Sequence, residues 1–164
     1  MIFLKTDRLI LRNFLPQDLD TLWDYRNHPA CSRYQRGQGN TRQELTALID
    51  EHRNRDLQSQ EKVCLAIADA TDQLVGDLTL YLNDPETISM GYTVSYAHHR
   101  KGYATELISA LLPLLHDRYP DREVICLVDP QNEASIGLLR KLGFSDLGYA
   151  EKITSQVFGM WAKP

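Results

Sequence analysis

The stretch Glu123–Asp129, EVICLVD, constrains the fold of this chain more than any other part of the sequence. It is a nearly continuous apolar run, which is typical of a central strand buried on both faces. Apolar residues recur at helical spacing before it, in Thr105–Tyr119, and after it, in Asn132–Leu142. A buried strand between two helices predicts a layered architecture in which helices cover a sheet.

Shorter segments predict the other strands of that sheet. Apolar patterning and bounding turns indicate strands at Arg8–Arg12, Lys62–Ala70, Leu74–Asn83, Ser89–Ser95, Phe144–Glu151 and Ile153–Trp161. The second and third of these are separated only by Thr71–Gln73, and so short a turn predicts an antiparallel hairpin. The element order therefore predicts an α/β (α+β) fold, with a mixed sheet and helices on both faces.

Prolines and capping residues set the expected helix boundaries. Pro16 opens a helix, because its missing N–H costs least in the first turn, and the helical run ends at the His28-Pro29 pair. Thr41 begins a T-x-x-E capping box that opens a second helix. Pro113 lies inside the helix that precedes the apolar run, where it predicts a kink or an early stop.

Composition narrows the class of protein. A chain of 164 residues with 43% apolar content is expected to form one domain, residues 1–164, that needs no disulfide or metal staple. The net charge of −4 argues against nucleic acid as the main partner. Cys31, Cys64 and Cys126 include no CxxC pair, which fits a reducing compartment. No signal peptide or apolar run of roughly 18 residues is found, so we expect a cytoplasmic protein without a membrane partner.

The segment Ser89–Thr105, SMGYTVSYAHHRKGYAT, carries the first candidate site. A strand runs into a loop with Arg100, Lys101 and Gly102, and a helix follows. The unpaired N–H groups and positive dipole of a helix N-terminus favour an anion, and a diphosphate fits such a loop. The loop could equally be an ordinary connection. Neither a Walker A motif nor a GxGxxG fingerprint is present.

The second candidate segment, Asp129–Phe144, follows the apolar run directly. Asn132 and Ser135 therefore lie at the carboxyl end of a central strand, where open α/β sheets commonly bind ligands. Asn132 is also a good helix N-cap, and Ser135 could be a neutral residue of the first turn. Local chemistry leaves these alternatives open.

Together these segments carry a family resemblance. His99–Ala104 (HRKGYA), with Asn132, Ser135 and Lys141–Phe144 (KLGF), resembles the GNAT superfamily of acetyl-CoA-dependent N-acetyltransferases. Thr6–Arg12 (TDRLILR) is similar to its ribosomal-protein N-terminal (alanine/serine) acetyltransferase branch. The resemblance spans essentially the whole chain. It implies a GNAT-like, mostly antiparallel, splayed sheet, and acetyl-CoA as cosubstrate.

The resemblance also implies roles for individual residues. The loop amides would hold the pyrophosphate of coenzyme A, while pantetheine would lie between the splayed strands, bonded near Val94 and by Asn132. Ser135 would lie near the thioester sulfur and aid departure of the thiolate, as the catalytic residue. The implied cosubstrate-binding residues are Val94, His99, Arg100, Lys101, Gly102, Tyr103, Ala104, Thr105, Asn132 and Ser135.

Three positions depart from the family pattern. His99 replaces the usual Gln or Arg, Ser89 stands where relatives can carry a catalytic Glu, and Leu139 stands where other branches place a tyrosine that acts as general acid. Asp84 and Glu86 precede the strand and are poor candidates for a base. The general base is therefore unassigned, and a non-catalytic CoA-binding sensor or regulator is the alternative function.

Without a general base, an amine that is already neutral at pH 7 is the favoured acceptor. At pH 7 an α-amine with a pKa of about 7.7–8.0 is neutral in roughly a tenth of molecules, whereas a lysine is neutral in about four of ten thousand. We therefore expect direct transfer to a peptide or protein N-terminal α-amine, with a small-molecule amine as the other acceptor class. Arg33, Tyr34 and Arg36, in a polar loop expected to be mobile at Ser32–Asn40, could line an acceptor pocket or merely a surface.

We predict structural rather than functional roles for several histidines and tryptophans. His98 and His99 are too close together to share a metal easily, so no metal is expected. His52 should lie at the surface or half-buried, and Trp161 should pack against the core or sheet. The terminal strands around Trp161 could also serve a homodimer.

Overall fold

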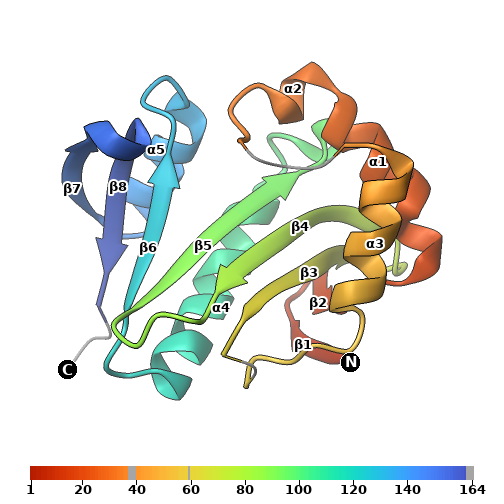
Figure 1. Cartoon of the computed structure of the whole chain (residues 1–164), viewed down its shortest axis with the longest axis horizontal. Coiled ribbons are helices and arrows are strands. Elements are labelled where there is room, and N and C mark those ends of the chain that lie inside the picture. Colours follow the sequence, from red (N-terminus) through yellow and green to blue (C-terminus); the bar gives the residue numbers. More distant parts are fainter. Residues whose placement is uncertain (37–39, 59, 162–164) are drawn as a thin grey trace.

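The computed structural model of this protein describes residues 1–36, 40–58 and 60–161. Within these ranges the chain forms one eight-stranded sheet flanked by helices (Figure 1). The strands are β1 Ile2–Lys5, β2 Leu9–Arg12, β3 Lys62–Asp69, β4 Leu74–Tyr81, β5 Thr87–Val94, β6 Glu123–Val128, β7 Ser145–Ala150 and β8 Ser155–Met160. The α-helices are α1 Leu19–Asn27, α2 Pro29–Ser32, α3 Arg42–His52, α4 Tyr103–Arg118 and α5 Glu133–Lys141.

The strand order is β1-β2-β3-β4-β5-β6-β8-β7, and among the described strands only the β5–β6 pair is parallel. That pairing is short, because it joins Thr87–Ser89 to Glu123–Ile125 and stops there. Beyond it the two strands diverge, which is visible in Figure 1. The predicted mixed, mostly antiparallel, splayed sheet is therefore confirmed.

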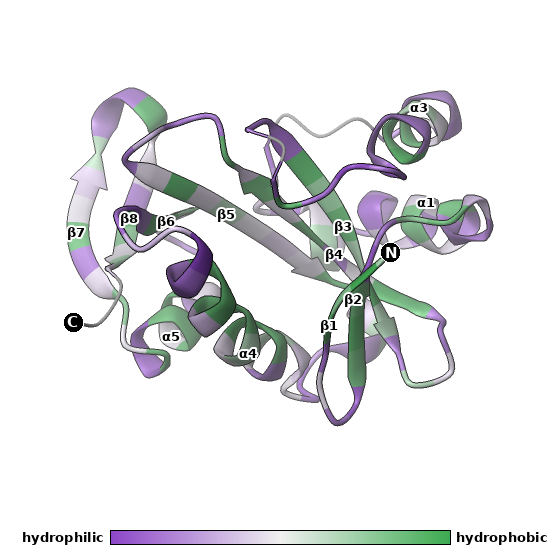
Figure 2. Ribbon diagram, turned by 90° about the horizontal axis from the view of Figure 1, so that it is seen from below, coloured by the Kyte–Doolittle hydropathy of each residue, from purple (hydrophilic) through white to green (hydrophobic). Residues whose placement is uncertain are grey.

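Helices cover both faces of the sheet, as predicted. Figure 2 shows α1 and α3 on one side and α4 and α5 on the other. The first pair buries Leu22 and Leu45 in one hydrophobic core, and the second pair buries Leu111 and Leu139 in the other. Burial of this apolar surface on both faces is the main term that stabilises the sheet.

The structure corrects the expectation that the apolar run is buried on both faces. Along β6 buried residues alternate with partly exposed ones, and Leu127 is 49% exposed. The reason is the placement of the helices, since α1 and α3 pack on β4 and β3 and leave one face of β6 uncovered. An apolar sequence alone therefore does not show that helices cover both faces of a strand.

Several element boundaries also differ from the predictions. The sequence patterns missed β1, which pairs with β2. Helix α4 begins at Tyr103 and continues through Pro113 to Arg118, so the predicted early stop does not occur. Pro29 also opens α2. The polar loop expected at Ser32–Asn40 begins with the last residue of α2, and its glycines lie outside the described residues.

Two side chains lie where sequence patterns did not place them. His52 is only 2% exposed, because α3 packs on β3 and turns this side chain toward it, where its Nδ1 accepts a hydrogen bond from the Cys64 amide at 3.3 Å. Trp161 is 56% exposed beyond the end of β8 and does not pack in the core. In the described residues no helix is long and apolar enough to cross a membrane.

Candidate functional site

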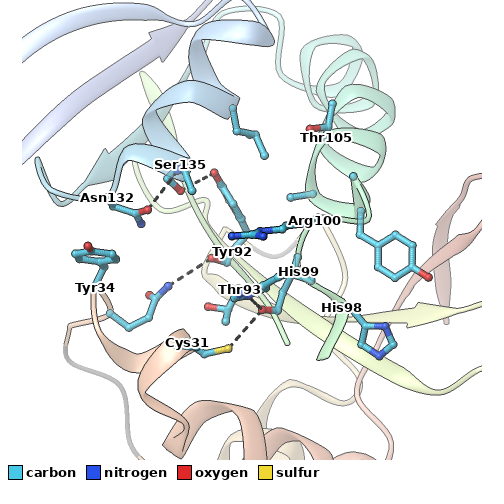
Figure 3. A pocket seen from close by; sticks show the side chains of 18 residues that line it. Cys31, Tyr34, Tyr92, Thr93, His98, His99, Arg100, Thr105, Asn132 and Ser135 are labelled. Atoms are coloured by element: carbon cyan, nitrogen blue, oxygen red, sulfur yellow. Dashed lines mark hydrogen bonds between the residues drawn. The ribbon is translucent and has the colours of Figure 1, made fainter. Parts of the chain in front are cut away.

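A cleft of about 540 Å³ opens where β5 leaves β6. Its walls come from the second half of β5, the loop before α4, the first turns of α4 and α5, and the segment around α2 (Figure 3). The structure brings together here every residue that the family resemblance implied for the cosubstrate except Lys101. Segments far apart in sequence thus meet because the sheet splays.

The loop before α4 has the backbone geometry of an anion site. Gly102 is the N-cap of α4 with a left-handed φ of +76°, and Arg100 is also left-handed at φ 64°. The N–H groups of the first helical turn, from Tyr103 to Thr105, have no acceptor within a helix. Lys101 lies apart, with its Nζ 3.2 Å from His98 Nδ1. The first turn can therefore offer amide donors to a phosphate.

The open edge of β5 presents backbone groups to the same cleft. The carbonyl of Val94 accepts hydrogen bonds from His99 Nε2 at 2.8 Å and from Cys31 Sγ at 3.5 Å. The carbonyl of Tyr92 accepts one from Gln35 Nε2 at 3.5 Å (Figure 3). Side chains thus occupy positions that a neighbouring strand would fill in a closed sheet. An extended amide ligand could exchange with them.

Ser135 and Asn132 lie at the start of α5, on the opposite wall. Asn132 is the N-cap, and its Oδ1 accepts a hydrogen bond from the Ser135 amide at 3.3 Å. Asn132 is therefore the N-cap of α5, as predicted, and it also lines the cleft. The Ser135 hydroxyl lies 2.8 Å from the hydroxyl of Tyr92, which reaches across from β5.

Tyr92 is one of several cleft-lining residues that the sequence analysis did not name as site residues. Its phenol is largely buried, and burial raises its pKa to about 12. A usable signal was present, because Tyr92 and Val94 are two residues apart and therefore orient alike on one strand. The contact with Ser135 could not be inferred, since it depends on how far the strands separate.

A second, smaller cavity of about 60 Å³ shares Tyr92 and Ser135 with the cleft and continues past Tyr34 toward Asp129. Arg36 binds Asp129 at 2.9 Å and the Ile153 carbonyl at 3.1 Å, so it ties the segment after α2 to the far side of the splay. A backbone hydrogen bond from Gln131 and the contact with Arg36 lower the pKa of Asp129.

Of the three loop residues expected at an acceptor pocket, Tyr34 lines both cavities. Arg36 lines neither cavity but binds Asp129, which lines the second one. Arg33 lines neither cavity and stacks on the Tyr34 ring.

Other candidates lie outside the cleft. Leu139 is fully buried in the core, and Ser89 is half-buried in the part of β5 that pairs with β6. Asp84 and Glu86 precede β5 and lie at the end opposite the cleft. Cys126 borders the second cavity but is only 2% exposed, and burial raises the pKa of its thiol to about 12. No group of metal-ligating side chains is found in the residues that the structure describes.

Comparisons with known proteins agree with this geometry. Residues 8–145 match the acetyltransferase (GNAT) domain family. The chain is 27% identical over 156 residues to the uncharacterized N-acetyltransferase p20 of Bacillus licheniformis, covering 88% of this chain and 83% of that protein.

Solved structures share the fold at low identity. An acetyltransferase (GNAT family) from Bacillus anthracis superposes with a TM-score of 0.84 at 18% identity, over all of both chains. The ribosomal-protein-S5-alanine acetyltransferase of Vibrio fischeri gives 0.77 at 14% identity, also over all of both chains. The spermidine N-acetyltransferase of Vibrio cholerae, solved with CoA and spermine, gives 0.76 at 19% identity over 94% of this chain and 95% of that one. With a family match over most of its length and this fold, the chain belongs to the GNAT acetyltransferase family.

Proposed function

We propose that this protein transfers the acetyl group of acetyl-CoA directly to a primary amine, and that a peptide or protein N-terminal α-amine is its preferred acceptor. The observation that carries the proposal is the cleft at the splay, which joins the amide-rich start of α4 to the hydroxyl of Ser135. Family membership supports acetyl transfer to an amine with acetyl-CoA as the donor. The acceptor preference and the direct route rest on the residues around the cleft.

The residues of the cleft fit the chemistry of coenzyme A. The first-turn amides of α4 and the side chain of Arg100 suit its diphosphate, because both supply positive potential. The free edge of β5 at Tyr92 and Val94 suits the two amides of pantetheine, which can pair with a strand as another strand would. Asn132 offers a side-chain amide on the opposite wall. The thioester would then lie near Ser135.

The two cysteines that border the cavities support direct transfer. An acyl-enzyme needs a thiolate, but burial raises the pKa of Cys31, which lines the cleft, and raises that of Cys126 to about 12. The neutral amine therefore attacks the thioester carbonyl itself, a C–N bond forms, and the C–S bond breaks. Ser135 donates a hydrogen bond to the departing thiolate, which stabilises the charge that develops there.

The lack of a free carboxylate in the cleft supports the acceptor preference. Asp129 is the one acidic side chain that lines either cavity in the described parts of the chain, and Arg36 already binds it. An amine must then arrive neutral, or lose its proton to water or to one of the two histidines that line the cleft, His98 and His99. The neutral fraction of an α-amine at pH 7 exceeds that of a lysine by a few hundredfold. α-Amines are therefore favoured unless the site supplies a base.

An acceptor panel at pH 7, followed by release of the CoA thiol, tests this function. A peptide with a free N-terminal Ala or Ser should turn over faster than the same peptide with its N-terminus blocked and one lysine free, and faster than spermidine. Equal or faster turnover of the ε-amine or the polyamine would contradict the α-amine preference.

Two further measurements separate the alternatives. Calorimetric binding of acetyl-CoA without thiol release to any amine would favour the non-catalytic sensor. The Cys126→Ala variant should retain turnover, because the thiol takes no part in direct transfer. A folded Cys126→Ala variant without turnover would favour an acyl-enzyme.

A further inference from the structure

Two hydroxyl groups face each other across the cleft. Tyr92 reaches from β5 and Ser135 from the first turn of α5, and their oxygens are 2.8 Å apart (Figure 3). β5 and β6 have already separated at this level, so the contact spans the splay. Neither hydroxyl has a second hydrogen-bond partner within the described residues.

Counting hydrogens shows what this pair can offer a ligand. Each hydroxyl carries one hydrogen, and the contact between them uses only one of the two. A phenol is a stronger donor and a weaker acceptor than an aliphatic alcohol, so the arrangement in which Tyr92 donates to Ser135 is favoured. The hydrogen of Ser135 is then free to point into the cleft that both residues line.

We infer that Tyr92 is a positioning residue, whose hydroxyl holds that of Ser135 so that the Ser135 hydrogen is directed at the sulfur of the departing coenzyme A. This inference rests on the proposed function and adds to it a residue on the opposite wall. The thiolate receives a hydrogen bond when the C–S bond breaks. The proton that finally neutralises it comes from the attacking amine through solvent, so Tyr92 and Ser135 end as they began.

The raised pKa of Tyr92 fits a hydroxyl that donates a hydrogen bond without losing its proton. Its pKa is about 12, whereas a free thiol titrates near 8.5. Full transfer of the phenolic proton to a thiolate would therefore be unfavourable by more than three powers of ten. No tyrosine on α5 can take this role at the family position, because Leu139 stands there and is buried in the core.

The ionisation of enzyme-bound CoA tests the inference without any turnover. Thiolate absorbance in the far ultraviolet, titrated between pH 6 and 9.5, reports the pKa of the bound thiol, with free protein as the blank. The protein's own thiols, Cys31, Cys64 and Cys126, interfere little because burial raises the pKa of each. The wild type should bind CoA with a thiol pKa below that of free CoA. Tyr92→Phe and Ser135→Ala should each move it back up.

Kinetics supply the second readout. Tyr92→Phe should lower kcat by about threefold to tenfold, and Ser135→Ala by about tenfold to a hundredfold, with the KM for acetyl-CoA within about twofold of the wild type. In the Ser135→Ala background, Tyr92→Phe should have no further effect, because its action passes through Ser135. Tyr149→Phe, an exposed tyrosine on β7, is the matched control and should change neither quantity.

The outcomes separate this inference from the function on which it rests. If the wild-type protein transfers acetyl groups but Tyr92→Phe changes neither the pKa of the bound thiol nor kcat, the inference is overturned and the proposed function stands. A raised KM with an unchanged thiol pKa assigns Tyr92 to the shape of the cleft and likewise overturns it. A protein that binds no CoA overturns both. If Tyr92→Phe folds poorly, an unchanged thiol pKa in Ser135→Ala is sufficient to reject the inference.

Discussion

Two tyrosines, the fully buried Tyr25 and the partly buried Tyr92, occupy opposite kinds of environment in this molecule. Tyr25, on α1, donates a hydrogen bond to the buried carboxylate of Asp77, which also pairs with Arg26 at 3.1 Å. Tyr92 lies on β5, the strand next to that of Asp77, and its hydroxyl contacts the neutral hydroxyl of Ser135 where β5 and β6 have separated. Burial raises the pKa of both phenols.

The comparison shows that burial and a shifted pKa do not by themselves mark a functional group. In the Tyr25 cluster the Tyr25 hydroxyl and Arg26 Nη2 both donate to the carboxylate of Asp77, which does not line the cleft. The Tyr92 pair keeps one hydrogen unused beside a space large enough for a ligand. Access to a ligand is the difference, and it predicts that substitutions in the first region alter stability while those in the second alter chemistry.

The largest expected effect is that of Asp77→Asn on stability. Arg26 and Asp77 are each 3% exposed, so removal of the carboxylate charge leaves a buried guanidinium uncompensated. Such losses cost about 3–5 kcal/mol of the free energy of unfolding, which urea denaturation can measure. Asp20→Asn, at the exposed pair with Arg42, is the control and should change little. Comparable losses at the two sites would contradict the distinction between buried scaffold and surface.

The matched pair Tyr25→Phe and Tyr92→Phe comes next. A hydrogen bond to a charged partner contributes about 1.5–3 kcal/mol and one between neutral groups about 0.5–1.5 kcal/mol. Tyr25→Phe should therefore lower the free energy of unfolding more than Tyr92→Phe does, while leaving kcat per folded molecule unchanged. If the two variants reverse this order, the assignment of one tyrosine to scaffold and the other to chemistry is wrong.

Gly102→Ala should weaken CoA binding. The glycine has φ +76°, where a side chain adds about 1–2 kcal/mol of strain, enough to weaken affinity about fivefold to thirtyfold if the loop relaxes in the free protein. Gly143, at φ +94° after α5, has a similar strain and a similarly distant nearest atom but lies outside the cleft. Gly143→Ala should therefore lose stability without losing affinity in calorimetry. Equal losses of affinity would indicate a general effect.

The smallest expected effect is a pH dependence from His52. Burial lowers the pKa of this imidazole in the folded protein, whereas the unfolded chain titrates near 6.5. Below about pH 6.5 the unfolded chain therefore binds more protons, and the free energy of unfolding falls as the pH is lowered. His52→Asn should flatten this dependence between pH 7.5 and 5.5. A slope that survives the substitution would assign the dependence to other groups.

Some features of the site follow from short stretches of sequence. Gly102 before a helical run, and Asn132 three residues before Ser135, are local signals whose geometry depends only on adjacent residues. They indicated correctly where α5 is capped and where α4 begins, to within two residues. The resemblance of these segments to a family then predicted that they lie together. The structure places them around one cleft.

Other features of the fold and the site could not be predicted from local sequence patterns. The segment β1 carries little alternation and is a strand because β2 offers it an edge. Leu127 looks like a core residue in sequence but is exposed, because no helix covers its face of β6. Arg36 meets Asp129 only because the segment after α2 passes over the splay.

The sequence by itself determined the periodicities, the caps, the left-handed glycine turn and hence the kinds of elements, because these depend on backbone sterics and hydrogen bonds among near neighbours. Only the tertiary structure decided that Tyr92 and Ser135, which are 43 residues apart, touch each other. That contact depends on where the β5–β6 pairing stops and on how far the strands then diverge. Both are set by the packing of helices on the two faces of the sheet, which no short stretch of sequence records.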